Sequence, residues 1–221
     1  MEPGGCYSTM KRVLMLVGLV ATILFSGAAA NAQMVSEKKV EKDAKKQAKV
    51  LEKEGWKVAP GHPSIEMQML KAAKINNTLD DNFNSKFVEG SAQAVAPTYD
   101  AAKFQATELA KIDIAGKISS ELAGIAKTNL GNQQIDPERA ENVVKTIGAY
   151  KNYVASKLTN IISCIDMYKV NPKNGQYTVS IGVFYNKEEA LNAGMKEVRE
   201  QMMKESEDLA NELDSLLGLK K

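Results

Sequence analysis

Few side chains in this 221-residue chain have the chemistry of a catalytic group. His62 is the only histidine, Cys164 is the only cysteine beyond the first ten residues, and Asp113 and Asp166 are carboxylates in otherwise apolar patterns. A cysteine beside a histidine could act as nucleophile and base, and two buried carboxylates could act as acid and base. However, His62 falls in a Pro-Gly-His-Pro turn, far in sequence from the strand that holds Cys164. We interpret His62 as a solvated turn residue, Cys164 as a small core residue, and each aspartate as a salt-bridge partner or a sheet-edge residue.

Motifs for cofactors and metals are missing from the sequence as well. One histidine and one cysteine make no zinc site without carboxylates, and no histidine or cysteine cluster has the spacing of metal ligands. The glycines are scattered singly, so there is no phosphate loop, dinucleotide fingerprint or serine elbow. We therefore expect a noncatalytic protein without a cofactor or a metal.

The first 32 residues have the pattern of a secretory signal peptide. Lys11 and Arg12 precede an apolar run at residues 13–25, and Ala30-Asn31-Ala32 is a small-residue cleavage site. A retained membrane anchor is the alternative, but the apolar run is shorter than the roughly 20 residues of a spanning helix. We predict cleavage after Ala32, and a bacterial protein that is periplasmic or secreted, with no transmembrane segment in its mature chain.

Charge and cysteine content limit the partners of the mature chain. Removing Lys11, Arg12 and Glu2 from 29 basic and 27 acidic residues leaves a nearly neutral protein, which argues against nucleic acid as a partner. Cys6 precedes the apolar run, so it is not a lipidation cysteine and it is removed with the signal. Cys164 then has no intramolecular disulfide partner.

Residues 33–85 are predicted to form a helical segment that packs with an α+β domain at 86–221 as one globular unit. A charged helix at 36–54 is followed by Gly55, and a turn at 60–63 leads into a second helix at about 64–76. The first helix has only a thin apolar stripe, which is typical of a helix on a protein surface.

The stretch "GSAQAVAPTYDAAKFQATELA" (residues 90–110) changes from a period of two to a period of about 3.6 at Pro97. Before the proline, one strand face carries Gly90, Ala92, Ala94 and Ala96. After the proline, a helix carries two stripes: Ala102, Ala106, Leu109 and Gly116, and Ile114, Ile118, Leu122 and Ile125. Small residues on both elements let their backbones approach closely, so we predict a tight seam between strand and helix.

A second helix and a hairpin follow. Asp136-Pro137 is predicted to open the helix, whose buried positions are Val143, Ile147, Tyr150, Val154, Leu158 and Ile161. Alternation at 163–186 around Asn174-Gly175 then predicts a hairpin with a two-residue turn, which would pair Val170 with Val179. The fold class is therefore α+β, with a small and mostly antiparallel sheet.

The last apolar pattern predicts one long helix after Asn186, roughly 45 Å in length at ~1.5 Å per residue. This helix is longer than a small domain needs to cover its own sheet, so it packs on the N-terminal helices or on another subunit. Its apolar positions form the candidate interface: Met195, Val198, Met202, Leu209, Leu213 and Leu216.

The order strand, two helices, hairpin and helix, with "GSAQAVAPTYDAAKFQATELAKIDIAGKI" leading and "GQYTVSIGVFYN" closing, resembles the Lpp-twenty-like lipoprotein family over residues 86–190. Members of that family are small bacterial envelope and secreted proteins, and similar domains occur in secreted toxin-like factors and a periplasmic flagellar ring component. The resemblance implies helices packed on a small antiparallel sheet and supplies no catalytic motif. Because this chain lacks a lipidation cysteine after its signal, the resemblance does not carry over a lipid anchor.

These features together predict a noncatalytic envelope protein that associates with itself, with another envelope protein or with the cell surface. The main alternative is a carrier of an unidentified apolar small molecule held between helix and sheet. A hydrolase using Cys164 or the aspartates is the weaker rival.

Overall fold

The computed structural model describes residues 37–130 and 137–217, which belong to one compact unit beginning at residue 36. The predicted signal peptide and its cleavage site lie outside the described residues. The elements are α2 (Glu37–Lys53), α3 (Ile65–Asn76), β1 (Phe87–Ala96), α4 (Tyr99–Leu130), α5 (Pro137–Ala149), α6 (Lys151–Lys157), β2 (Ile162–Val170), β3 (Tyr177–Asn186), α7 (Lys187–Glu205) and α8 (Glu207–Leu216). The fold is α+β, as predicted.

The three strands form an antiparallel sheet in the order β1-β3-β2. The predicted hairpin is present, but its register differs by two residues, because Val170 pairs with Tyr177 rather than Val179. The connection is a four-residue loop at 172–175, closed by Asn171 and Gln176 and ending at Gly175 with φ +70°. The shift is even for residues 165–170, so these side chains keep the face that the predicted register gives them, whereas the bulge at Cys164 reverses the faces of the residues before it.

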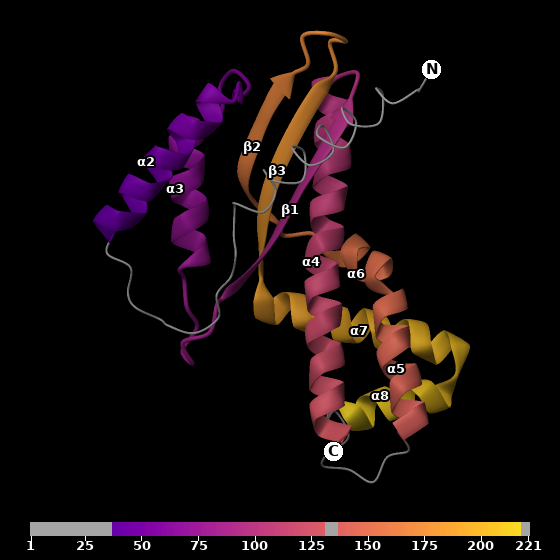
Figure 1. Cartoon of the computed structure of the whole chain (residues 1–221). Helices are drawn as coiled ribbons and strands as arrows, with labels where there is room; N and C mark the ends of the chain where they lie inside the picture. Colours follow the sequence, from indigo (N-terminus) through magenta and orange to yellow (C-terminus); the bar gives the residue numbers. More distant parts are fainter. Residues whose placement is uncertain (1–36, 131–136, 218–221) are drawn as a thin grey trace, which may run out of the picture. The chain divides into compact units, whose positions relative to one another are not determined.

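Helices cover both faces of this sheet (Figure 1). α4 lies on one face, against β1 and β3, while α3 lies on the other and carries α2 on its outer side. The α3 side has its own apolar centre, in which Phe184 and Met167 are fully buried. The sheet is therefore a middle layer, although the face of β1 opposite α4 is exposed at Ser91, Gln93 and Val95.

The predicted seam of small residues lies between β1 and α4. Ala94 and Ala96 on the strand and Ala102 and Ala106 on the helix are all buried. A Cβ atom added at Gly90 would lie 2.2 Å from the carbonyl oxygen of Ala110, so only glycine fits there. The small residues set the distance between helix and sheet, as the sequence predicted.

α4 packs against both the sheet and the later helices, because its row of buried side chains winds around the helix axis. The row repeats every four residues: Ala102, Ala106, Ala110, Ile114, Ile118, Leu122 and Ala126. Each step of four residues advances about 40° around a helix with 3.6 residues per turn. The row therefore faces the sheet at its start and α5 to α8 at its end (Figure 1). Leu109 and Ile125 were expected in buried stripes, but both are exposed, because the row winds away from them.

The two long helices predicted in the second half of the chain are each broken. The predicted helix at 137–161 is divided into α5 and α6 at Tyr150, although its predicted core residues are buried or half-buried. The final helix ends at Glu205, and Ser206 has extended backbone angles before α8 begins. Arg199 of α7 then binds both carboxylate oxygens of Asp214 in α8 through three hydrogen bonds of 2.8 to 3.0 Å. The single 45 Å helix is therefore wrong, and α7 and α8 fold back on one another.

Within the described ranges, no helix combines the length and the apolar character that a membrane crossing requires.

Candidate functional site

Cys164 and His62, the sequence candidates for nucleophile and base, are not paired in the described part of the chain. Cys164 is buried at a bulge in β2, between the paired residues Ser163 and Ile165, and lies outside the α4-side core that contains Tyr168. Burial raises the pKa of its thiol, against the lowering effect of a nearby lysine. A raised pKa disfavours the thiolate, which is the reactive form of cysteine. Its surroundings are those of a core residue.

Asp166 is the centre of a polar cluster drawn from three separate parts of the chain, which we name the Asp166 cluster: His62, Gln68, Tyr99, Lys103 and Asp166. The Tyr99 hydroxyl donates to Asp166 Oδ1 at 2.8 Å, and Lys103 Nζ lies 2.6 Å from Oδ2. His62 Nε2 lies 3.5 Å from the same Oδ2. The Gln68 side chain bonds both the N–H and the carbonyl of Asp166. One buried carboxylate thus receives donors on both of its oxygens.

The electrostatics of this cluster favour a structural role. Burial, together with the hydrogen bond and the charge of Asp166, raises the pKa of Tyr99 to about 12. Burial works to lower the pKa of Lys103, but the hydrogen bond and charge of Asp166 outweigh it and the pKa rises. Tyrosine therefore stays neutral and lysine charged at neutral pH, and neither group is poised to exchange a proton.

Of the two explanations given for Asp166, a salt bridge or a sheet-edge position, the salt bridge is present, but its partners were not identified from the sequence. Tyr99 and Lys103 are four residues apart on one helix, so they lie on the same side of it as the alanine seam. This spacing could have indicated from the sequence that both side chains lie near the sheet. His62, interpreted as a solvated turn residue, is partly exposed yet contacts Asp166. Gln68 had no local signal, because only the folded chain brings α3 to the edge of β2.

Asp113 lies at the opposite edge of the sheet, so the two aspartates do not form an acid–base pair. Its Oδ2 accepts from the backbone N–H of Ser91 at 3.1 Å and from Lys117 at 3.0 Å. The Lys117 ammonium also donates to the Glu89 carbonyl at 2.7 Å. The Ser91 N–H and the Glu89 carbonyl lie on the edge of β1 that is not paired with β3. The side chains of Asp113 and Lys117 therefore satisfy part of this free edge.

Glu89 is the second carboxylate at this edge. Burial raises its pKa to about 7, with Lys117 lowering it and Asp113 raising it. Two carboxylates thus lie near one lysine, and burial outweighs the attraction of that lysine, so Glu89 holds its proton more strongly than usual.

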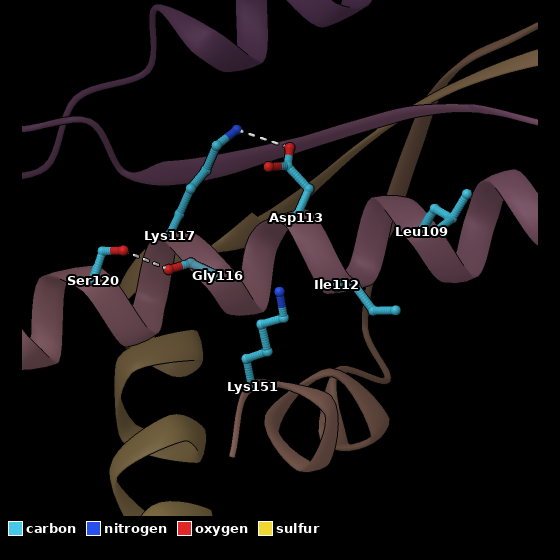
Figure 2. Close-up of a pocket in the computed structure, with 7 residues that line it drawn as sticks. All are labelled: Leu109, Ile112, Asp113, Gly116, Lys117, Ser120 and Lys151. Atoms are coloured by element: carbon cyan, nitrogen blue, oxygen red, sulfur yellow. Dashed lines mark hydrogen bonds and ion pairs between the residues drawn. The ribbon is translucent and has the colours of Figure 1, made fainter. Parts of the chain in front are cut away.

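A groove of about 590 Å³ runs along the exposed side of α4 and is closed on one side by α6 (Figure 2). We name it the α4 groove, and its lining residues are Leu109, Ile112, Asp113, Gly116, Lys117, Ser120 and Lys151. Leu109 and Ile112 give it an apolar surface and Lys151 gives it a positive charge, while Lys117 is paired with Asp113. The sequence did not indicate this groove, because Lys151 is more than thirty residues from Gly116 in the chain.

Lys151 is the first residue of α6, and its side chain rises toward α4 between Ile112 and Gly116 (Figure 2). Among the residues that the structure describes, no carboxylate or hydrogen-bond acceptor is paired with it. Gly116 keeps the space above it open, since an added Cβ would meet nothing within 4 Å. The groove therefore combines an unpaired ammonium group with an open apolar floor.

The candidate interface on the last helix lies in the core of the monomer instead. Val198, Met202, Leu213 and Leu216 are fully buried, and Met195 and Leu209 pack against the same core. These side chains hold α7 and α8 to α4 and α5. An interface built from them would require this core to open.

In the described residues, no three histidine, cysteine, aspartate or glutamate side chains are grouped to hold a metal ion. Comparison of the chain with protein-family models, curated proteins and solved structures found no match. The α4 groove is therefore assigned as the candidate site from its geometry alone.

Proposed function

We propose that this chain is an exported, noncatalytic envelope protein that acts by associating with itself or with another protein, and that the α4 groove is its binding surface. The observation that carries the proposal is the unpaired Lys151 ammonium over an open apolar floor. A lysine left without a carboxylate beside apolar surface is suited to a ligand that brings both an acidic and an apolar group.

The noncatalytic part of the proposal is supported by the state of the reactive groups. The Cys164 thiol is buried with a raised pKa, and the Asp166 carboxylate is bonded by tyrosine and lysine within the fold. Neither group faces the α4 groove. A hydrolase would need a nucleophile and a base beside a space for substrate.

The open form of the groove favours a protein segment over a small apolar molecule. Small-molecule sites usually enclose most of the ligand surface, whereas this groove lies along the outside of a helix. The carrier hypothesis placed its ligand between helix and sheet, but at Gly90 the backbones of β1 and α4 are in contact. A partner that lays a segment along α4 fits the observed surface better.

Export is supported by the signal-peptide pattern at residues 1–32 and by the resemblance to small envelope proteins. Expression of the full chain in a Gram-negative bacterium, followed by fractionation and intact-mass measurement, tests it. We expect a periplasmic or secreted protein that begins at Gln33, and Ala32→Tyr should block cleavage. Uncleaved wild-type protein in the cytoplasm would contradict the export hypothesis.

Native mass spectrometry of the exported protein tests the binding role. We expect an assembled species or a copurified protein, with Gly116→Leu reducing either by filling the groove. Gly124→Leu is the matched control, because Gly124 also lies on α4 with open space around it but outside the groove. A monomer that carries a small extra mass would favour the carrier, and equal effects of the two variants would contradict a role for the groove.

A further inference from the structure

The connection between α3 and β1 forms a compact loop that presents an aromatic side chain to solvent. We name residues 78–85 the Phe83 loop. Leu79 and Ser85 form an antiparallel bridge at its base, and Asp80 Oδ1 accepts from the N–H groups of Asn82 at 2.9 Å and Asn84 at 2.8 Å. The ring of Phe83 is 78% exposed, the highest exposure among the large hydrophobic residues described.

The backbone of this loop holds Phe83 in a conformation that its residue type disfavours. Its φ angle is +62°, in the left-handed region that glycine and asparagine adopt more readily. A bulky aromatic residue at such a position, exposed to water, is not explained by the stability of the loop itself. The residue type at this position therefore points to a contact outside the monomer.

Acidic residues accompany the ring. The Asp80 carboxylate is used within the loop, whereas Asp81 is exposed and has no ion pair or hydrogen bond in the parts of the chain that the structure describes. The tip of the Phe83 loop therefore offers one aromatic ring and one free negative charge on a short, turn-like segment.

These two groups match the apolar residues and the unpaired lysine of the α4 groove. Leu109 and Ile112 supply an apolar floor for a ring, and Lys151 supplies an ammonium group for a carboxylate. An aromatic ring buries roughly 150 to 250 Å² when it enters an apolar site, which makes it an effective anchor. The charge and apolar character of the loop and the groove are complementary within one sequence.

We infer that the Phe83 loop of one copy docks in the α4 groove of a second copy. This inference rests on the proposed function and names the partner of the same groove. In Figure 1 the loop lies between α3 and β1, on the side of the sheet that carries α3, whereas α6 lies beside α4. The contact is therefore made between copies, either reciprocally in a closed dimer or head to tail in a longer series.

The test measures self-association of the exported protein by light scattering and native mass spectrometry over a range of concentrations. Phe83→Asn removes the ring but suits the left-handed backbone, so the loop should keep its conformation. We expect it to weaken self-association at least about tenfold, the scale of a central anchor residue. Gly116→Leu should have a similar effect, and Gly124→Leu should have little.

A charge exchange makes the test specific to the pairing of Asp81 with Lys151. Asp81→Lys and Lys151→Glu should each weaken self-association by several fold, and the chain that carries both should recover it. Far-UV circular dichroism and melting temperature check that each variant remains folded. Recovery in the double variant would support the docking, whether the assembly is a dimer or longer.

The outcomes separate this inference from the proposed function. If Gly116→Leu weakens binding and Phe83→Asn does not, the groove binds another segment, and the docking of the Phe83 loop is overturned while the proposed function stands. If the wild-type protein stays monomeric at high concentration, the second copy is not the partner. If the two glycine variants behave alike, the groove itself is not the binding surface.

Discussion

The two edges of the sheet handle charge in opposite ways. At the β2 edge one carboxylate, Asp166, receives donors from tyrosine and lysine and contacts a histidine. At the β1 edge two carboxylates, Asp113 and Glu89, lie near Lys117, and the unpaired Lys151 stands across the groove. The first edge is closed by its own fold, because both carboxylate oxygens of Asp166 have partners within the chain. At the second edge, two carboxylates share one lysine, and the Lys151 ammonium has no partner among the residues that the structure describes.

This difference teaches that reactive residue types do not by themselves mark a site. The Asp166 cluster holds residues that a search for catalysis selects first, yet its carboxylate is buried and is bonded by the other members of the cluster. The α4 groove holds ordinary surface residues, but they face open space. A buried charge that is fully paired contributes to the order of the fold, while an unpaired charge at an open surface is available to a partner.

The largest expected effect is the loss of Asp166. Asp166→Ala removes the acceptor of Tyr99 and Lys103 and leaves both near the buried edge of β2. Removing one member of a fully buried pair costs about 3 to 5 kcal/mol, and since 37% of the Lys103 side chain is exposed, we expect a loss of about 2 to 3 kcal/mol. Urea unfolding followed by circular dichroism measures it.

Asp166→Asn is the matched control for that measurement, since it keeps an acceptor for Tyr99 and removes the charge that pairs with Lys103. Its loss should be smaller than that of alanine. A loss below about 0.5 kcal/mol for Asp166→Ala, the range of ordinary surface substitutions, would show that the cluster is not a structural element.

Local patterns predicted the elements and the seam, and they failed where distant residues meet. Gly90 and the alanines around Pro97 indicated the close approach of β1 and α4, because residue size and periodicity are local properties. The hairpin register depended on the loop at 172–175, which has four residues rather than the two expected from Asn174-Gly175. Residues 165–170 nevertheless keep the face that the predicted register implies, because the shift there is even, but the bulge at Cys164 had no local signal.

The break between α7 and α8 had a local signal that was outweighed by the continuous apolar pattern. Ser206 is followed by Glu207 and Asp208, which is a common start of a helix. The bidentate contact between Arg199 and Asp214, fifteen residues apart, holds the folded-back arrangement and has no local signature. The α4 groove also has no local signature in the sequence, since Lys151 comes close to α4 only in the folded chain.

A smaller effect is expected at Glu89, and it depends on pH. Its pKa is raised from an ordinary 4.5 to about 7, first by burial, so the folded protein holds this proton more tightly than the unfolded chain. Its contribution to stability is complete below about pH 4.5 and is lost as the pH rises toward 7. Glu89→Gln should remove this loss and stabilise the protein at pH 8 by about 1 kcal/mol, allowing for solvent screening.

Melting temperatures of wild-type and Glu89→Gln protein between pH 4 and pH 8 check this expectation. The two curves should separate progressively across that interval, with the glutamine variant higher at the alkaline end. Parallel curves would mean that Lys117 neutralises Glu89 in the folded state and that the β1 edge has no surplus carboxylate.

The smallest effect on stability is expected at Lys151. Lys151→Ala removes a side chain that has no ion pair in the described residues, so the free energy of unfolding should change by less than about 0.5 kcal/mol. The matched variant Lys103→Ala, at the other edge, should cost more because it strips Asp166 of its cation. If the two lysine variants destabilised the monomer equally, Lys151 would be part of the fold. A neutral effect on unfolding with a clear loss of self-association would place its contribution in binding alone.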